Sequence, residues 1–233
     1  MSFRIRCLAI LLVTCPGWGD LLPRRPAVLQ GKSQAQVHHT LTGNIQVIRG
    51  FQSRYLPDRD IVVYLPPGYE QGDRRYPVFY MQDGQNLFDA ATAFLGNEWH
   101  LDETLERLIG EGQTEPLIVV GIYNTGKMRI DEYTPVRDRK GQGGQARRYG
   151  KLLHRELKPY IDRRFRTLSD AAHTGLGGSS LGGLVTLYLG LQYPHVFGKL
   201  AVLSPSVWWA YRDILKRVQR LTKKTDQKIW LDI

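Results

Sequence analysis

The sequence offers almost no sulfur chemistry. Its 233 residues include two cysteines, Cys7 and Cys15, and both lie near the N-terminus. The rest of the chain therefore has neither a disulfide framework nor a cysteine nucleophile. A chain of this length can bury a hydrophobic core without disulfides or a structural metal, so we expect one folded domain.

Long apolar runs are also missing. The apolar stretch at 7–15 follows Arg4 and Arg6 and is too short to span a bilayer. Basic residues followed by a short apolar stretch are typical of an export signal, here residues 1–19. We expect either cleavage near Gly19 or lipid attachment at Cys15, and a buried N-terminal segment is the alternative.

Export implies a periplasmic or secreted protein. The polar residues 20–42 are expected to form a linker, and residues 43–233 the folded domain. No internal repeat is seen.

Acidic residues are fewer than basic ones, 22 against 32, which gives a formal net charge of +10. Such a charge invites a nucleic-acid partner, but no nucleic-acid-binding motif is present. The basic residues concentrate at 137–148, interpreted as a mobile surface loop, and at 212–228, interpreted as the solvated face of a helix. We expect no nucleic-acid partner, and an anionic or polysaccharide substrate stays open.

The glycine-rich segment 175–183 contains the pattern Gly-x-Ser-x-Gly, centred on Ser180. In a nucleophile elbow a buried strand leads into a sharp turn that exposes the serine, and a helix follows. A short run from Thr174 to Leu176 precedes the glycines, and apolar residues at helical spacing follow them until Pro194. The pattern favours a serine nucleophile, and the alternative is a plain glycine-rich turn.

Two phosphate-binding motifs are excluded at the same place. A dinucleotide-binding loop requires a third glycine where Ser180 stands, and an acidic residue about 20 positions later, where residues 199–203 have none. A P-loop fails because Gly-Lys-Ser/Thr is absent. No cofactor is expected.

Strand and helix patterns alternate along the domain. Runs typical of strands occur at 45–49, 61–65, 76–81, 117–122, 174–176 and 199–203. Apolar positions at helical spacing occur at 101–109, at 153–161 and after Ser180. This order predicts an α/β fold with a mainly parallel central sheet and helices on both faces. In such sheets the chemistry lies beyond the carboxyl ends of the strands.

Four ordered motifs follow these strands or lie between them. They are Asp-Gly-Gln-Asn-Leu-Phe at 83–88, Glu-Tyr-Thr-Pro at 132–135, Gly-Ser-Ser-Leu-Gly-Gly at 178–183, and Ser-Pro-Ser at 204–206 before two tryptophans. With them the chain resembles the esterase D and enterochelin-esterase-like branch of the α/β-hydrolases, which includes feruloyl and acetylxylan esterases. The resemblance extends from about residue 45 to the end.

The resemblance implies a serine carboxylic-ester hydrolase that works without a metal. Ser180 would form an acyl-enzyme, on acyl esters of carbohydrates, phenolic acids or siderophores. The backbone N–H groups of Leu181 and Gln85 would bind the oxyanion. A loop held by its own Asp and Asn side chains is the alternative reading of residues 83–89.

Substrate contacts are expected from Trp208, Trp209 and Asn124, with Tyr123 as a further candidate. At least one tryptophan is expected to pack in the core. Arg129 and Glu132 are expected to form a structural ion pair beneath their loop, in preference to direct substrate contact.

The general base is the missing part of the site. In this fold the triad acid and histidine follow the serine in sequence, and His195 is the only histidine after Ser180. The intervening helix rises about 1.5 Å per residue, which places His195 about 20 Å away. His173 precedes the serine on an extended run and is expected to be equally distant. We predict that neither is the base.

The other histidines fit no better. His38 and His39 fall in the expected linker, His154 in a helix, and His100 is expected to be structural or to line the substrate pocket rather than to act in catalysis. Residues 228–233 have the pattern of a strand whose following loop would carry the acid. We therefore expect a fold that lacks its C-terminal strand and helix, and very weak hydrolysis by these residues alone.

Two other functions stay open. An acyltransferase would use Ser180 in the same way, and a noncatalytic glycan-binding protein could keep the fold. The oligomeric state is not encoded in any recognisable pattern.

Overall fold

A computed structural model describes residues 38–222 and 224–232. These residues belong to one compact unit that extends from Val37 to Ile233. The expected export signal, the lipid attachment at Cys15 and residues 20–37 of the expected linker lie outside the described residues.

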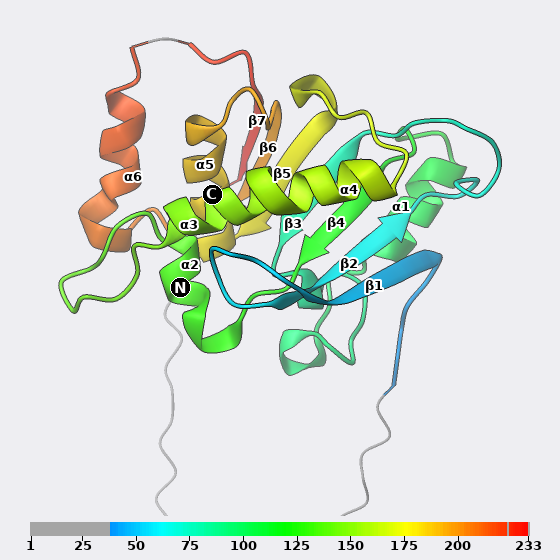
Figure 1. Cartoon of the computed structure of the whole chain (residues 1–233), viewed down its shortest axis with the longest axis horizontal. Coiled ribbons are helices and arrows are strands. Elements are labelled where there is room, and N and C mark those ends of the chain that lie inside the picture. Colours follow the sequence, from blue (N-terminus) through cyan, green and yellow to red (C-terminus); the bar gives the residue numbers. More distant parts are fainter. Residues whose placement is uncertain (1–37, 223, 233) are drawn as a thin grey trace, which may run out of the picture. The chain divides into compact units, whose positions relative to one another are not determined.

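Seven strands form one sheet in the order β1-β2-β4-β3-β5-β6-β7 (Figure 1). β1 pairs antiparallel with β2, and β2 antiparallel with β4, whereas every other pair is parallel. The strands are β1 (Asn44–Phe51), β2 (Arg59–Leu65), β3 (Val78–Gln82), β4 (Ile118–Ile122), β5 (Thr174–Ser179), β6 (Lys199–Leu203) and β7 (Lys228–Asp232). The predicted mainly parallel sheet is confirmed, and its first two pairings are antiparallel.

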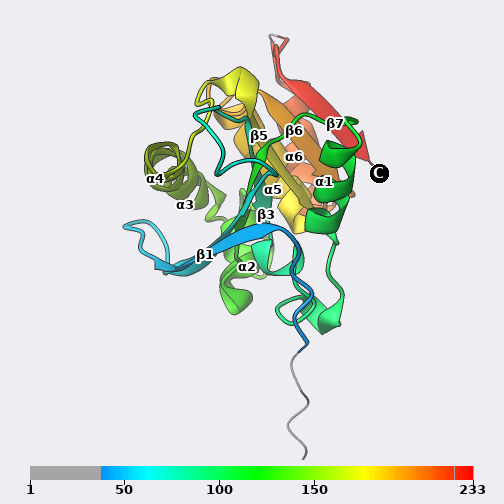
Figure 2. The same ribbon diagram turned by 90° about the vertical axis from the view of Figure 1, so that its right-hand side faces the viewer.

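Helices lie on both faces of the sheet (Figure 2). The α-helices are α1 (Leu101–Gly110), α2 (Arg129–Tyr133), α3 (Ala146–Lys151), α4 (Lys158–Arg164), α5 (Leu181–Gln192) and α6 (Trp209–Gln219). A π-helical stretch, Leu152–Leu157, joins α3 to α4, and 3₁₀ turns occur at Gly84–Asn86, Phe94–Gly96, Gly126–Met128 and Ala171–His173. None of the helices in the described residues is long and apolar enough to cross a membrane.

The alternation of side chains along β2 divides the core into two layers. Val62 and Tyr64 pack in the cluster that contains Leu105 of α1. Ile61 and Val63 face the opposite way, into the larger cluster formed with α3, α4 and α5. Each fully buried aliphatic side chain contributes about 1.5–3 kcal/mol to folding. This two-sided burial explains why β2 and β4 read as continuous apolar runs.

β3 begins two residues later than its sequence pattern predicts. Pro77 has no N–H to donate to a neighbouring strand. Tyr76 instead forms an isolated bridge with Thr167, and the regular pairing with β4 and β5 starts at Val78.

Candidate active site

Ser180 occupies a single-residue bend between β5 and α5. Its backbone has φ 58° and ψ −120°, and the residue is exposed. The Ser180 N–H donates to the Leu203 carbonyl at 3.1 Å, and its own carbonyl accepts from the Ser206 N–H at 3.0 Å. A non-glycine residue with such torsions costs about 1–3 kcal/mol and persists only where its surroundings hold it.

Glycines make this bend possible. A Cβ at Gly178 would lie 2.7 Å from Gln82 Cγ and 2.9 Å from the Gly182 carbonyl carbon. A Cβ at Gly183 would lie 2.8 Å from the Leu203 carbonyl oxygen. The close approach of α5 to β3 and β6 therefore requires residues without a side chain on both sides of Ser180.

The Ser180 hydroxyl has one side-chain partner within the described residues. Its Oγ lies 3.2 Å from Ser206 Oγ, and Ser206 is buried. Leu181 is the first residue of α5, so its N–H has no partner within the helix. The partial positive charge at this helix end favours negative charge beside Ser180.

The neighbouring strand β3 is followed by a second strained residue, Asp83, with φ 56°. Arg129 donates to both carboxylate oxygens of Asp83, at 2.8 and 2.7 Å, and Asn124 Nδ2 donates to Oδ1 at 2.7 Å. The Asp83 N–H donates to the Tyr133 hydroxyl at 3.1 Å. Burial raises the pKa of Tyr133, so this hydroxyl remains protonated. These four contacts fix the start of the loop that carries Gln85.

Gln85 follows in a 3₁₀ turn. Its side-chain Oε1 accepts from the Asn124 N–H at 3.2 Å, and its carbonyl accepts from Thr92 Oγ1 at 2.6 Å. The turn lies directly on β4, since a Cβ at Gly84 would be 2.4 Å from the Gly121 carbonyl carbon. Asn124 thus contacts both Asp83 and Gln85, and in this structure its amide supports the loop.

The predicted ion pair between Arg129 and Glu132 is wrong. Arg129 binds Asp83, while Glu132 accepts two hydrogen bonds from Arg59, both at 2.9 Å. Glu132 has no exposed surface, and a fully buried carboxylate requires a charged donor at close range. Arg59, at the start of β2, meets that need with its planar guanidinium. Thr125 Oγ1 also donates to Glu132, at 3.0 Å.

The two tryptophans differ in exposure. Trp209 is buried and donates from Nε1 to the Val136 carbonyl at 2.8 Å. Trp208 is 64% exposed and lies two residues after Ser206. Of the expected pair, Trp208 is the one whose ring is available to a ligand.

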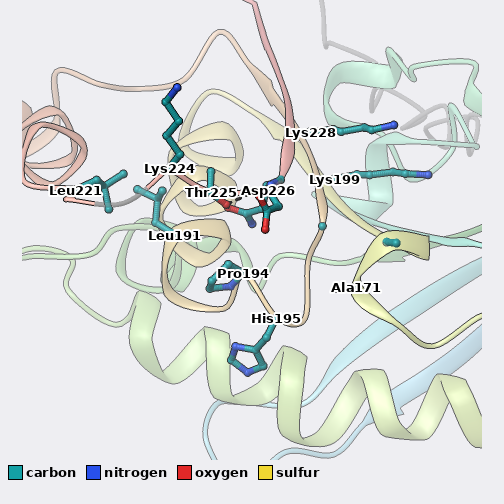
Figure 3. A pocket seen from close by; sticks show the side chains of 13 residues that line it. Ala171, Leu191, Pro194, His195, Lys199, Leu221, Lys224, Thr225, Asp226 and Lys228 are labelled. Carbon is teal, nitrogen blue, oxygen red and sulfur yellow. Dashed lines mark hydrogen bonds between the residues drawn. The ribbon is translucent and has the colours of Figure 1, made fainter.

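Two of the histidines lie at the opposite edge of the sheet from Ser180. His195 lines a cavity of about 680 Å³ together with Ala171, Lys199 and Lys228 (Figure 3). Lys199 and Lys228 are the first residues of β6 and β7, so this cavity lies at the amino ends of the strands. His173 precedes β5 and pairs with Asp170 at 2.7 Å. His173 and Ser180 lie at opposite ends of β5. The six residues of this strand span about 20 Å, so His173 is too far from Ser180 to act as its base.

Residues 38–42, at the end of the expected linker, contact the loop after β3. His39 Nδ1 lies 2.7 Å from Asp89 Oδ2, and the Ala90 N–H donates to Thr40 Oγ1 at 2.9 Å. These contacts could not be predicted from the sequence, because Asp89 and His39 are far apart in the chain and share no pattern.

Comparisons with known proteins show the family of the chain. Residues 54–233 match the model of the family described as "Putative esterase". The chain belongs to this esterase family.

Two relatives of the chain have esterase in their names. The chain is 31% identical over 170 residues to an endo-1,4-beta-xylanase/feruloyl esterase of Xylanibacter ruminicola, which covers 70% of this chain and 22% of that protein. It is 27% identical over 174 residues to the ferri-bacillibactin esterase BesA of Bacillus subtilis, and this match covers 66% of the chain and 57% of BesA. The chain therefore spans less than two thirds of either relative.

A solved structure shares the fold. An IroE-like serine hydrolase of Shewanella oneidensis superposes with a TM-score of 0.64 at 28% identity, over 76% of this chain and 55% of that one. The chain thus has the α/β-hydrolase fold that the sequence motifs imply.

The close packing around the Ser180 bend predicts that a larger residue at Gly183 lowers the free energy of unfolding. Gly183→Ala should lower the free energy of unfolding by about 1–3 kcal/mol, because its Cβ meets backbone atoms that cannot move aside. Gly110→Ala is the matched control, since Gly110 is helical and a Cβ there meets nothing within 4 Å. The control should be stabilised by about 0.5–1 kcal/mol. Urea denaturation measures both, and equal stabilities would contradict the close approach at Gly183.

Proposed function

We propose that the esterase cleaves its substrates through an acyl-enzyme on Ser180. Ser180 Oγ forms a bond to the ester carbonyl carbon, the alcohol leaves with a proton, and water then releases the acid and restores the serine. The observation that carries this proposal is the exposed hydroxyl on a strained bend at the amino end of α5.

The oxyanion is assigned to two backbone N–H groups. Leu181 follows the nucleophile at the first position of α5. Gln85 lies in the 3₁₀ turn after the adjacent strand β3, in the loop whose first residue, Asp83, is held by Arg129. One such donor is typically worth about 10²- to 10³-fold in rate.

We propose a phenolic ester as the substrate, either a hydroxycinnamoyl ester or an ester of a catechol siderophore. The exposed indole of Trp208 next to the Ser-Pro-Ser loop offers a face on which a phenolic ring can stack. The names of the feruloyl esterase and of BesA agree with this choice. The excess of ten positive charges favours an anionic substrate such as a ferric siderophore.

We also propose that residues 1–19 act as an export signal. A basic start followed by a short apolar stretch supports this assignment. An exported esterase would meet these esters outside the cytoplasm.

Imidazole rescue tests the role of Ser180. No histidine of the described residues is hydrogen-bonded to Ser180, so hydrolysis of 4-nitrophenyl acetate should be slow. Added imidazole can supply the general base, an effect worth up to about 10²–10⁴-fold when the base is held in place. We expect imidazole to raise the rate of the wild-type chain at least about tenfold above its effect on Ser180→Ala.

The matched control is Ser169→Ala, because Ser169 is exposed and precedes β5, at the amino edge of the sheet. This variant should respond to imidazole like the wild type. Equal rates for wild type and Ser180→Ala at every imidazole concentration would refute the nucleophile assignment.

Trp208→Ala should weaken binding of methyl ferulate about two- to tenfold, the loss expected for one aromatic stacking contact. Trp209→Ala is the contrast, because it removes a core residue and should lower the free energy of unfolding by about 3–5 kcal/mol. Calorimetric titration and thermal unfolding separate the two effects. An unchanged Kd in Trp208→Ala would remove this residue from the substrate site.

A further inference from the structure

A cluster of one imidazole and two carboxylates lies at the start of α1. Glu98, His100 and Glu103 place one ligand atom each within 4.8 Å of one another. Nothing in the ester chemistry at Ser180 uses these residues. The expectation that ester hydrolysis needs no metal concerns the reaction at Ser180 and not this cluster.

The distances in this cluster are too long for direct hydrogen bonds. His100 Nδ1 lies 3.7 Å from Glu98 Oε1 and 3.5 Å from Glu103 Oε1, whereas such bonds measure about 2.7–3.2 Å. Zinc bonds to imidazole nitrogen and carboxylate oxygen are about 2.0–2.2 Å, which gives tetrahedral edges of about 3.3–3.6 Å between ligands. The two distances from His100 are close to this ligand spacing, and the two carboxylates lie within 4.8 Å of each other.

A second observation is the state of Glu98. Its side chain is 1% exposed, and Oε2 is buried with no hydrogen-bond partner in the described structure. Oε1 accepts from Thr40 Oγ1, a neutral donor that does not offset the charge. Buried carboxylate charge of this kind is costly unless a cation compensates it.

We propose that Glu98, His100 and Glu103 bind a divalent transition-metal ion, with zinc as the preferred species. Imidazole with carboxylate suits zinc better than calcium or magnesium, which take oxygen ligands. His100 and Glu103 are 66% and 37% exposed, so the site is open to ions from solvent, and water completes the coordination.

The bound ion acts as a clamp on the loop that returns from the active site. The Trp99 N–H donates to the Asn86 carbonyl at 2.9 Å, and the Leu101 N–H to the Leu87 carbonyl at 3.1 Å. Fixing residues 98–103 therefore also fixes residues 86–87, directly after Gln85.

The test is zinc binding by the untagged full chain after removal of metals with EDTA. We expect one zinc ion per chain, and at a hundredfold excess of zinc over Kd a rise in Tm of about 5 °C. Cobalt should show the absorption bands of a low-symmetry, four- or five-coordinate site. Calcium and magnesium should have little effect.

Three variants locate the site. Glu98→Gln and His100→Ala should each weaken zinc binding at least about tenfold. His173→Ala is the matched control, because His173 also pairs with a carboxylate, Asp170, but belongs to no three-ligand cluster among the described residues. It should bind zinc like the wild type.

A folding defect is separated from a binding defect in EDTA. There Glu98→Gln should have a Tm equal to or above that of the wild type, since a neutral amide replaces a buried charge. Zinc binding that persists in both Glu98→Gln and His100→Ala would assign the ion to other residues, such as Cys7 and Cys15, and overturn the proposal. An equal response to calcium and zinc, or no response at all, would overturn it as well.

Discussion

The close approach of three backbones around Ser180 is the constraint on which the site depends. β3, β5 and β6 are neighbours, and each is followed by a non-glycine residue with positive φ: Asp83 at 56°, Ser180 at 58° and Ser204 at 38°. Such strain persists only where surrounding contacts over-determine it. Here the glycines that flank Ser180 let α5 lie directly against β3 and β6, and hydrogen bonds from neighbouring loops hold the bend.

The loop after β3, the second part of the site, is held by ion pairs rather than by the close packing of glycines. Asp83 starts the loop that carries Gln85, and Arg129 and Asn124 hold its carboxylate. The ion pair between Arg59 and Glu132 anchors α2 to the start of β2. These two ion pairs join β2, α2 and the loop after β3, so they position the loop that carries Gln85, one of the two proposed oxyanion donors.

The sequence predicts those features that depend on local chain order. The glycine pattern marked the bend at Ser180, and continuous apolar runs marked β2 and β4. Features that depend on long-range pairing were not readable. Arg129 and Glu132 stand three residues apart and were paired with each other, although each binds a residue more than 40 positions away. Two adjacent tryptophans look identical in sequence, and only the packing of α6 shows that Trp209 is buried while Trp208 is exposed.

The most direct test of the account is to identify the serine that reacts with a fluorophosphonate in the presence of imidazole, by peptide mass spectrometry. Ser206 is a true competitor, because its hydroxyl lies 3.2 Å from that of Ser180. We expect a single adduct on Ser180, which is exposed and next to the Leu181 N–H. An adduct on Ser206, or no adduct within the segment 178–206, would contradict it.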